Sequence, residues 1–109
     1  MEKNTQDKIK ELQMLEQNLQ GVTMQRQNFQ SRLLEVENAT QELSNKPEEV
    51  YKIIGQIMVK TKIEDVEKDL GSKKEIFELK VKTSEKNENK IKDKAKEIQE
   101  AIMKELKDE

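Results

Sequence analysis

The sequence VYKIIGQIMVK, residues 50–60, decides the fold of this chain. Apolar side chains dominate both of its arms, and Gly55 followed by Gln56 lies at its centre. This dipeptide suits a two-residue type II′ turn, because glycine takes the positive φ of the first central position at little steric cost. The stretch therefore predicts an antiparallel β-hairpin in which Ile54 pairs with Ile57.

Heptad repeats flank the hairpin on both sides. Apolar residues alternate there in steps of three and four, which is the a/d seam of a coiled coil. Arg26 and Thr40 interrupt the first seam, and Lys74, Ser84 and Glu88 occupy positions of the second. The apolar seam residues are Leu12, Leu15, Leu19, Val22, Phe29, Leu33, Val36 and Leu43, then Leu70, Phe77, Val81, Ile91, Ala95, Ile98 and Ile102. The pattern predicts two long helices that pair through these seams.

The predicted helices span about residues 4–44 and 63–107, with the hairpin at about 49–61. Asn45 suits a left-handed position at the end of the first helix, and Pro47 cannot continue that helix. All 109 residues are expected to form a single domain. The predicted fold class is mainly α, a long antiparallel two-helix coiled coil with one β-hairpin at the turn.

The two seams can be aligned from residue numbers alone. In an antiparallel pair each a position faces a d position, and pairing residues whose numbers add up to 110 achieves this throughout. Leu33 then faces Phe77. The alignment also predicts that Arg26 lies close to Ser84 and within reach of Glu88.

Composition excludes several functional classes. Apolar residues make up 32% of the chain and aromatic residues 3%, too little for a thick globular core. Net charge is −2 with both signs interleaved, so no basic surface for nucleic acid or an anionic membrane is expected. No apolar run approaches the ~20 residues of a membrane span. Because cysteine is absent, a disulfide scaffold is excluded and a cytoplasmic location is the default expectation.

Catalytic chemistry lacks its usual residues. Histidine and cysteine are both absent, which removes the commonest general base, the thiol nucleophile and the ligands of ordinary zinc sites. Carboxylates are plentiful, but on a coiled-coil exterior they lie outside any pocket that would raise a pKa. The sequence predicts no enzyme, no metal site and no cofactor.

The hairpin carries the strongest functional signal. Both of its faces are largely apolar and both of its edges are open, and such a hairpin is marginal and prone to aggregate in water. We therefore expect several copies, or a related partner chain, to pool their hairpins into a shared sheet or barrel. The alternative is a hairpin folded against its own helices. The predicted oligomerisation residues are Val50, Tyr51, Ile53, Ile54, Gly55, Ile57, Met58 and Val59.

Helix, single hairpin and returning helix of equal length resemble the β-type subunits of the prefoldin family, along essentially the whole chain. The specific part of the resemblance is Tyr51-Lys52, Gly55 and the apolar strand 57–59, followed by the acidic start of the second helix. The linker between the helices has room for one hairpin, whereas prefoldin α-type subunits carry two. The resemblance therefore indicates a β-type chain.

The resemblance implies a hetero-hexamer of two α and four β chains whose hairpins form a double β-barrel platform. Six coiled coils extend from such a platform. Their tips hold unfolded polypeptides without ATP and pass them to a group II chaperonin. The expected partners are therefore unfolded client proteins, the chaperonin and an α-type subunit.

Near the free ends of the helices the aligned seam fails. Lys8 would face Ile102 there, and Thr5 would face Glu105. Apolar residues nevertheless continue, so we interpret this end as an exposed client-binding tip. The predicted tip residues are Ile9, Leu12, Ile98, Ile102, Met103 and Leu106. Ordinary fraying of helix ends is the simpler alternative, and a scaffolding coiled coil without clients is a second functional hypothesis, which explains the heptads but not the hairpin.

Overall fold

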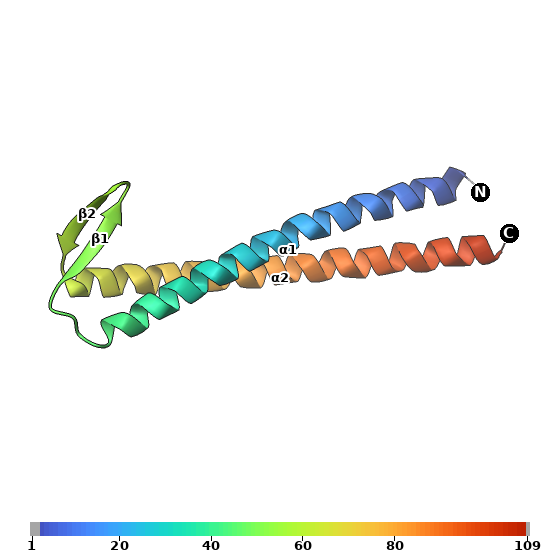
Figure 1. Ribbon diagram of the computed structural model, residues 1–109. Helices are drawn as coiled ribbons and strands as arrows, with labels where there is room; N and C mark the ends of the chain where they lie inside the picture. Colours follow the sequence, from blue (N-terminus) through green and yellow to red (C-terminus); the bar gives the residue numbers. More distant parts are fainter. Residues whose placement is uncertain (1–2, 109) are drawn as a thin grey trace. The chain divides into compact units, whose positions relative to one another are not determined.

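The computed structural model describes residues 3–108. One hairpin connects two long helices, in the chain order α1, β1, β2, α2 (Figure 1). The elements are α1 Lys3–Leu43, β1 Val50–Ile54, β2 Ile57–Thr61 and α2 Ile63–Lys107. The predicted fold class of two long helices with one hairpin at the turn is confirmed.

The end of α1 is set by its last turn and by Pro47. Backbone N–H groups of Asn45 and Lys46 donate to carbonyls three residues back, at 3.2 and 3.0 Å, so the helix tightens as it ends. Lys46 then takes a left-handed conformation with φ 52°. We expected Asn45 at that position, but Asn45 still belongs to the tightened turn, and the reversal of the chain comes one residue later.

The strands β1 and β2 form a two-stranded antiparallel sheet with the predicted register. The pairs are Val50 with Thr61, Tyr51 with Lys60, Lys52 with Val59, Ile53 with Met58, and Ile54 with Ile57. Gly55 has φ 62°, and among residues 3–108 Lys46 is the one non-glycine residue with positive φ. Positive φ at the first central residue but not at the second is the type II′ pattern, so the predicted turn is confirmed.

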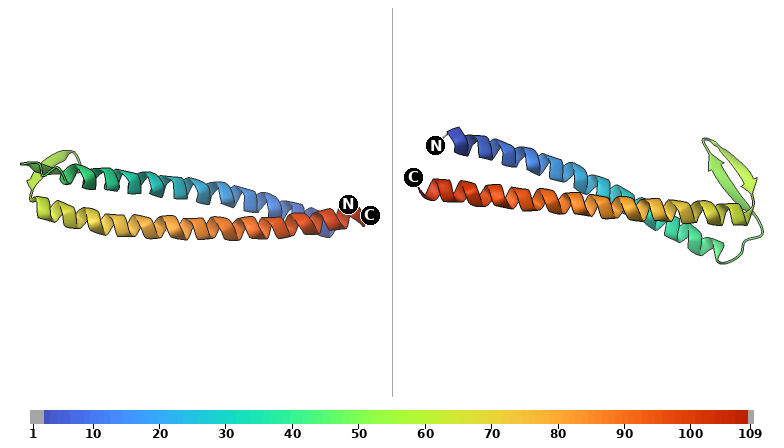
Figure 2. Two further views of the ribbon diagram at one scale, coloured as in Figure 1. Left: turned by 90° about the horizontal axis from the view of Figure 1, so that it is seen from below. Right: turned by 180° about the vertical axis from the view of Figure 1, so that it is seen from behind.

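The chain divides into two compact units, each described by itself. The hairpin unit comprises residues 28–81, and the terminal unit comprises the described residues of 1–27 and 82–109. Each contains one segment of α1 and one segment of α2, coloured in sequence order in Figure 2.

Seam positions supply the buried side chains of both units. The side chains that are buried are Val36 and Leu43 in the hairpin unit and Thr5, Ser84, Glu88 and Ile102 in the terminal unit. Most other seam residues are half-buried. Thr40 is exposed and its hydroxyl donates to the carbonyl of Val36 at 2.8 Å, while the neighbouring Ala39 is half-buried. Thr40 thus interrupts the seam, as the sequence indicates.

Candidate functional site

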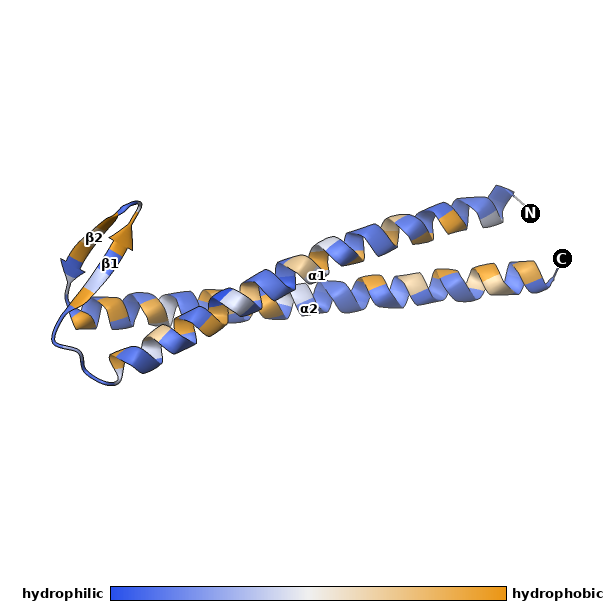
Figure 3. Cartoon of the chain, in the orientation of Figure 1, coloured by the Kyte–Doolittle hydropathy of each residue, from blue (hydrophilic) through white to orange (hydrophobic). Residues whose placement is uncertain are grey.

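The hairpin exposes apolar side chains on both of its faces. Ile53 is 71% exposed and its cross-strand partner Met58 is 67% exposed, while Ile54 and Ile57 on the other face are 54% and 61% exposed. Apolar colour covers much of both strands, and hydrophilic colour marks the middle of β1 and the end of β2 (Figure 3). The helices of the same chain therefore leave the hairpin uncovered, contrary to the alternative in which it folds against them.

The hairpin borders an open groove of about 700 Å³ within the hairpin unit. Tyr51, Ile53 and Met58 line the groove from the hairpin, and Leu43 and Leu70 line it from α1 and α2. Lys52 lies between Tyr51 and Ile53 and points to the other face of the strand, yet it also lines the groove. Side chains of both hairpin faces therefore border the groove, and Ile53 and Met58 remain largely exposed within it.

Polar contacts at the hairpin are exposed and weak. Lys52 on β1 lies 3.8 Å from the carboxylate of Asp69 on α2. On the opposite face the Tyr51 hydroxyl donates to Glu49 at 2.7 Å, and Lys60 lies 3.5 Å from the same carboxylate. The bond to Glu49 raises the pKa of Tyr51, because it favours the protonated phenol. Exposed ion pairs contribute ~1 kcal/mol or less, so these contacts add little stability and leave the apolar side chains of the hairpin exposed.

The predicted tip residues all lie in the terminal unit and differ in exposure. Met103 is 70% exposed and Leu106 is 43% exposed, whereas Ile102 is buried. The remaining three, Ile9, Leu12 and Ile98, are half-buried. Part of the predicted apolar surface is therefore accessible, and part lies inside the seam.

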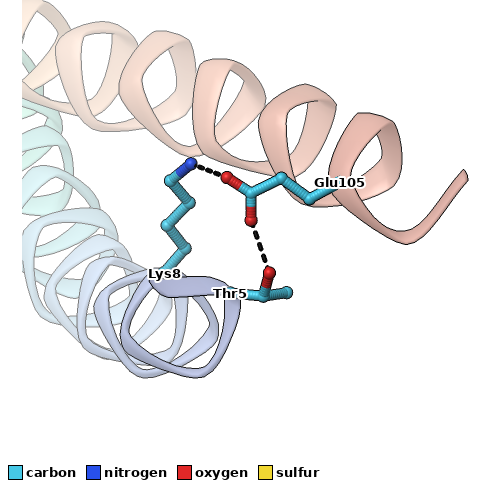
Figure 4. Close-up of polar contacts among 3 residues, drawn as sticks. All are labelled: Thr5, Lys8 and Glu105. Atoms are coloured by element: carbon cyan, nitrogen blue, oxygen red, sulfur yellow. Dashed lines mark hydrogen bonds and ion pairs between the residues drawn. The ribbon is translucent and has the colours of Figure 1, made fainter. Parts of the chain in front are cut away.

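A polar cluster closes the seam of the terminal unit (Figure 4). The Thr5 hydroxyl donates to Glu105 Oε2 at 2.5 Å, and the Lys8 ammonium donates to Glu105 Oε1. These two bonds, that of Lys8 first, hold the pKa of Glu105 below its ordinary value. The alignment predicts that Thr5 faces Glu105, which is confirmed, but sequence reasoning took this layer as a failure of the seam. The pairing of a hydroxyl and an ammonium with one carboxylate was the signal that it missed.

A second polar layer lies further along the same unit. Glu88 is 5% exposed, and it accepts hydrogen bonds from Arg26 Nε and, at 3.1 Å, from the Thr23 hydroxyl. Ser84 is likewise 5% exposed. The predicted proximity of Arg26 and Glu88 is confirmed. Among the described residues no buried side-chain nitrogen or oxygen lacks a hydrogen-bond partner, so this layer is satisfied.

The described residues offer no site for a metal and no membrane span. No group of three acidic side chains within residues 3–108 is placed to hold an ion. Neither α1 nor α2, in its described part, is apolar enough over sufficient length to cross a bilayer. The candidate functional surfaces of the chain are therefore the apolar hairpin and the end of the terminal unit.

Known proteins share this arrangement over nearly the whole chain. A family model described as prefoldin subunit matches residues 6–109. The chain is 39% identical over 99 residues to the prefoldin subunit beta of Archaeoglobus fulgidus, covering 89% of this chain and 85% of the relative. Identity to the prefoldin subunit beta of Sulfurisphaera tokodaii is 36% over 99 residues, covering 89% and 79%.

A solved structure agrees with the same relatives. The crystal structure of the prefoldin beta subunit from Thermococcus strain KS-1 superimposes with a TM-score of 0.89 at 31% identity. The match covers 96% of this chain and 94% of that one. Sequence and fold agree along the chain, and the chain therefore belongs to the prefoldin subunit family, with beta subunits as its relatives.

Proposed function

We propose that this chain is the β-type subunit of a hetero-hexamer with two α-type and four β-type chains. Its hairpin joins those of its partners in a β-barrel platform. The observation that carries the proposal is the exposure of Ile53, Met58, Ile54 and Ile57 on both hairpin faces. Each strand also has one free edge, because the sheet has two strands. Neighbouring hairpins would satisfy the edges and bury the faces in one step.

The assembled protein acts as an ATP-independent chaperone in the cytoplasm. It captures unfolded polypeptides at the free ends of its helix pairs and delivers them to a group II chaperonin. Exposed Met103 and Leu106, together with Ile9, Leu12, Ile98 and Ile102, provide the apolar contacts. Binding by one helix pair is weak, and several pairs on one platform raise the effective concentration of sites for a client that spans them.

A scaffolding coiled coil without clients would need the helix pairing but not the apolar hairpin faces. The deciding experiment is a mass measurement of this chain with and without an α-type partner, by native mass spectrometry. We expect a complex of two partner chains and four copies of this chain. A chain that stays monomeric in both cases would contradict the platform.

Client capture is tested on the same complex by light scattering from a denatured protein diluted into buffer without ATP. We expect the complex to suppress aggregation. A variant that lacks the residues after Ile98 should assemble with the same subunit stoichiometry. It should lose most of the suppression of client aggregation. Equal protection by the truncated complex would place client binding elsewhere, on the platform or on the inner helix surfaces.

A further inference from the structure

The terminal unit ends in a polar layer that engages every oxygen of one carboxylate. Glu105 Oε2 accepts from the Thr5 hydroxyl at 2.5 Å, and Oε1 accepts from the Lys8 ammonium (Figure 4). Thr5 is 1% exposed, which is deeper burial than that of any apolar seam residue. A small hydroxyl side chain is this strongly buried only when another side chain covers it. The cluster is therefore a closed contact between α1 and α2.

The same layer lies over apolar seam residues. Thr5 and Lys8 are three residues apart on one stripe of α1, and Ile102 and Glu105 are three apart on one stripe of α2. The alignment that places Thr5 against Glu105 places Lys8 against Ile102, so the stem of Lys8 covers an apolar side chain while its ammonium bonds to Glu105. Ile102 is accordingly 8% exposed.

The closure is held by contacts that open easily. The side chains of Lys8 and Glu105 are 29% and 25% exposed, and ion pairs with this much access to water contribute little. The contact also lies near the ends of both helices, where local opening needs the least free energy. Opening would uncover Ile102 first and then the half-buried pair Leu12 and Ile98.

We propose that Thr5, Lys8 and Glu105 form a latch that holds the tip closed over Ile102, and that capture of an unfolded client requires this latch to open. The inference rests on the proposed client capture and adds a conformational step to it. In the closed state Met103 and Leu106 make the first contact with the client. In the open state the seam residues Ile102, Leu12 and Ile98 add to the apolar surface.

A disulfide tests the latch cleanly, because the chain contains no cysteine. The variant T5C/E105C, assembled with its α-type partner, carries one thiol pair across the latch. Oxidation should remove most of the suppression of aggregation, and reduction should restore it. The matched control L33C/F77C closes the seam of the hairpin unit instead, and it should protect the client equally in both redox states.

A second variant measures opening without a client. Glu105→Lys places a second ammonium beside Lys8, and the repulsion should open the latch. Amide hydrogen exchange should then accelerate at residues 5–12 and 98–106 but not at 29–36 in the hairpin unit. We also expect this variant to suppress aggregation at a lower chaperone concentration than the wild type.

The outcomes separate the latch from the underlying function. Full protection by the oxidised T5C/E105C complex, or unchanged exchange in Glu105→Lys, would overturn the latch. A wild-type complex that fails to protect any denatured client would overturn the proposed client capture instead. In that case the exchange measurement still decides whether the three residues hold the tip closed.

Discussion

The two units of this chain distribute polarity in opposite ways. Among the described residues of the terminal unit, three of the four buried side chains are polar: Thr5, Ser84 and Glu88. In the hairpin unit, the buried side chains are apolar, while Ile53 and Met58 remain 71% and 67% exposed. Polar side chains are thus buried between the helices of the terminal unit, and apolar side chains are exposed on the hairpin.

This contrast separates specificity from association. A buried polar layer contributes little net stability, but it penalises every alignment of two helices that leaves it unpaired. Exposed apolar faces are stable only when another surface covers them. The buried polar layers of the terminal unit therefore favour one internal pairing, and the exposed hairpin faces are the surface that we propose for contact with other chains.

The largest effect is expected at the hairpin. Replacing Ile53 and Met58 by aspartate would force two charges into a shared barrel, which costs several kcal/mol per copy and should abolish assembly while leaving the helices formed. Analytical ultracentrifugation reports the loss. Leu34→Asp with Leu79→Asp is the matched control, since these residues of the same unit are 57% and 65% exposed on the helices. An intact complex formed by the hairpin variant would contradict assembly through the hairpin faces.

A smaller effect is expected in the central polar layer of the terminal unit. Glu88→Leu removes the ion pair between Glu88 and Arg26 and should lower the free energy of unfolding by about 2 kcal/mol, since Arg26 is partly exposed. Adding Arg26→Leu should return the free energy of unfolding to the wild-type value or raise it further. The double variant should also lose specificity for one helix register. Urea unfolding of the two variants gives the comparison.

The control for this layer is an exposed ion pair in the same unit. Glu11 lies 3.8 Å from Lys94, and both side chains are at least half exposed. Glu11→Leu should change the free energy of unfolding by less than ~0.5 kcal/mol. Equal losses in Glu11→Leu and Glu88→Leu would mean that burial of the layer adds nothing.

Both units should gain similar stability from the same helix substitution. Gly21 in the terminal unit and Gly71 in the hairpin unit lie inside helices, and a Cβ at either position meets no atom within 4 Å. Alanine should therefore stabilise each by up to ~1 kcal/mol. Gly55→Ala should destabilise, because φ is 62° there. Thermal unfolding measures these changes. A loss of stability in Gly21→Ala or Gly71→Ala would mean that the added methyl group meets a neighbouring atom there.

The smallest effect is a difference in pH response. The pKa of Glu105 is lowered from 4.5 in the folded chain, so its contribution is present above that pH and disappears as pH falls through the lower, folded value. The pKa of Tyr51 is raised from 10.0, so its contribution is present below that pH and is lost as pH rises through the folded value.

Amide exchange around each residue reads these two responses separately. Acid should loosen the terminal unit near Glu105, and alkali should loosen the hairpin near Tyr51. Glu105→Gln and Tyr51→Phe should each flatten its own response and leave the other unchanged. A response of both regions to the same pH change would contradict separate causes.

Much of the fold could be predicted because periodicity and one turn determine it. The step of three and four residues fixes the helix faces and, through the pairing of a with d positions, the alignment of Thr5 with Glu105, while Gly55 fixes the hairpin register. The contact of Arg26 with Glu88 follows from the same alignment. These features depend on spacing, which a sequence displays directly.

The remaining features depend on the reach of individual side chains. Glu105 accepts from Thr5 and Lys8 at once, and a pairwise seam gives no sign of such a three-way contact. The left-handed residue is Lys46 rather than Asn45, since the last turn of α1 tightens by a few hydrogen bonds. Such local conformations depend on small differences in free energy, which residue spacing does not reveal.

The return of α2 along α1 also has a consequence for the order of folding. Contacts near the hairpin join residues close in sequence, whereas Arg26 and Glu88 are 62 residues apart and Thr5 and Glu105 are 100 apart. Loop closure becomes costlier with separation unless the intervening contacts already exist. We therefore expect the helices to zip from the turn outward, so that the contact of Thr5 with Glu105 is the last to form during folding and the first to be lost during unfolding.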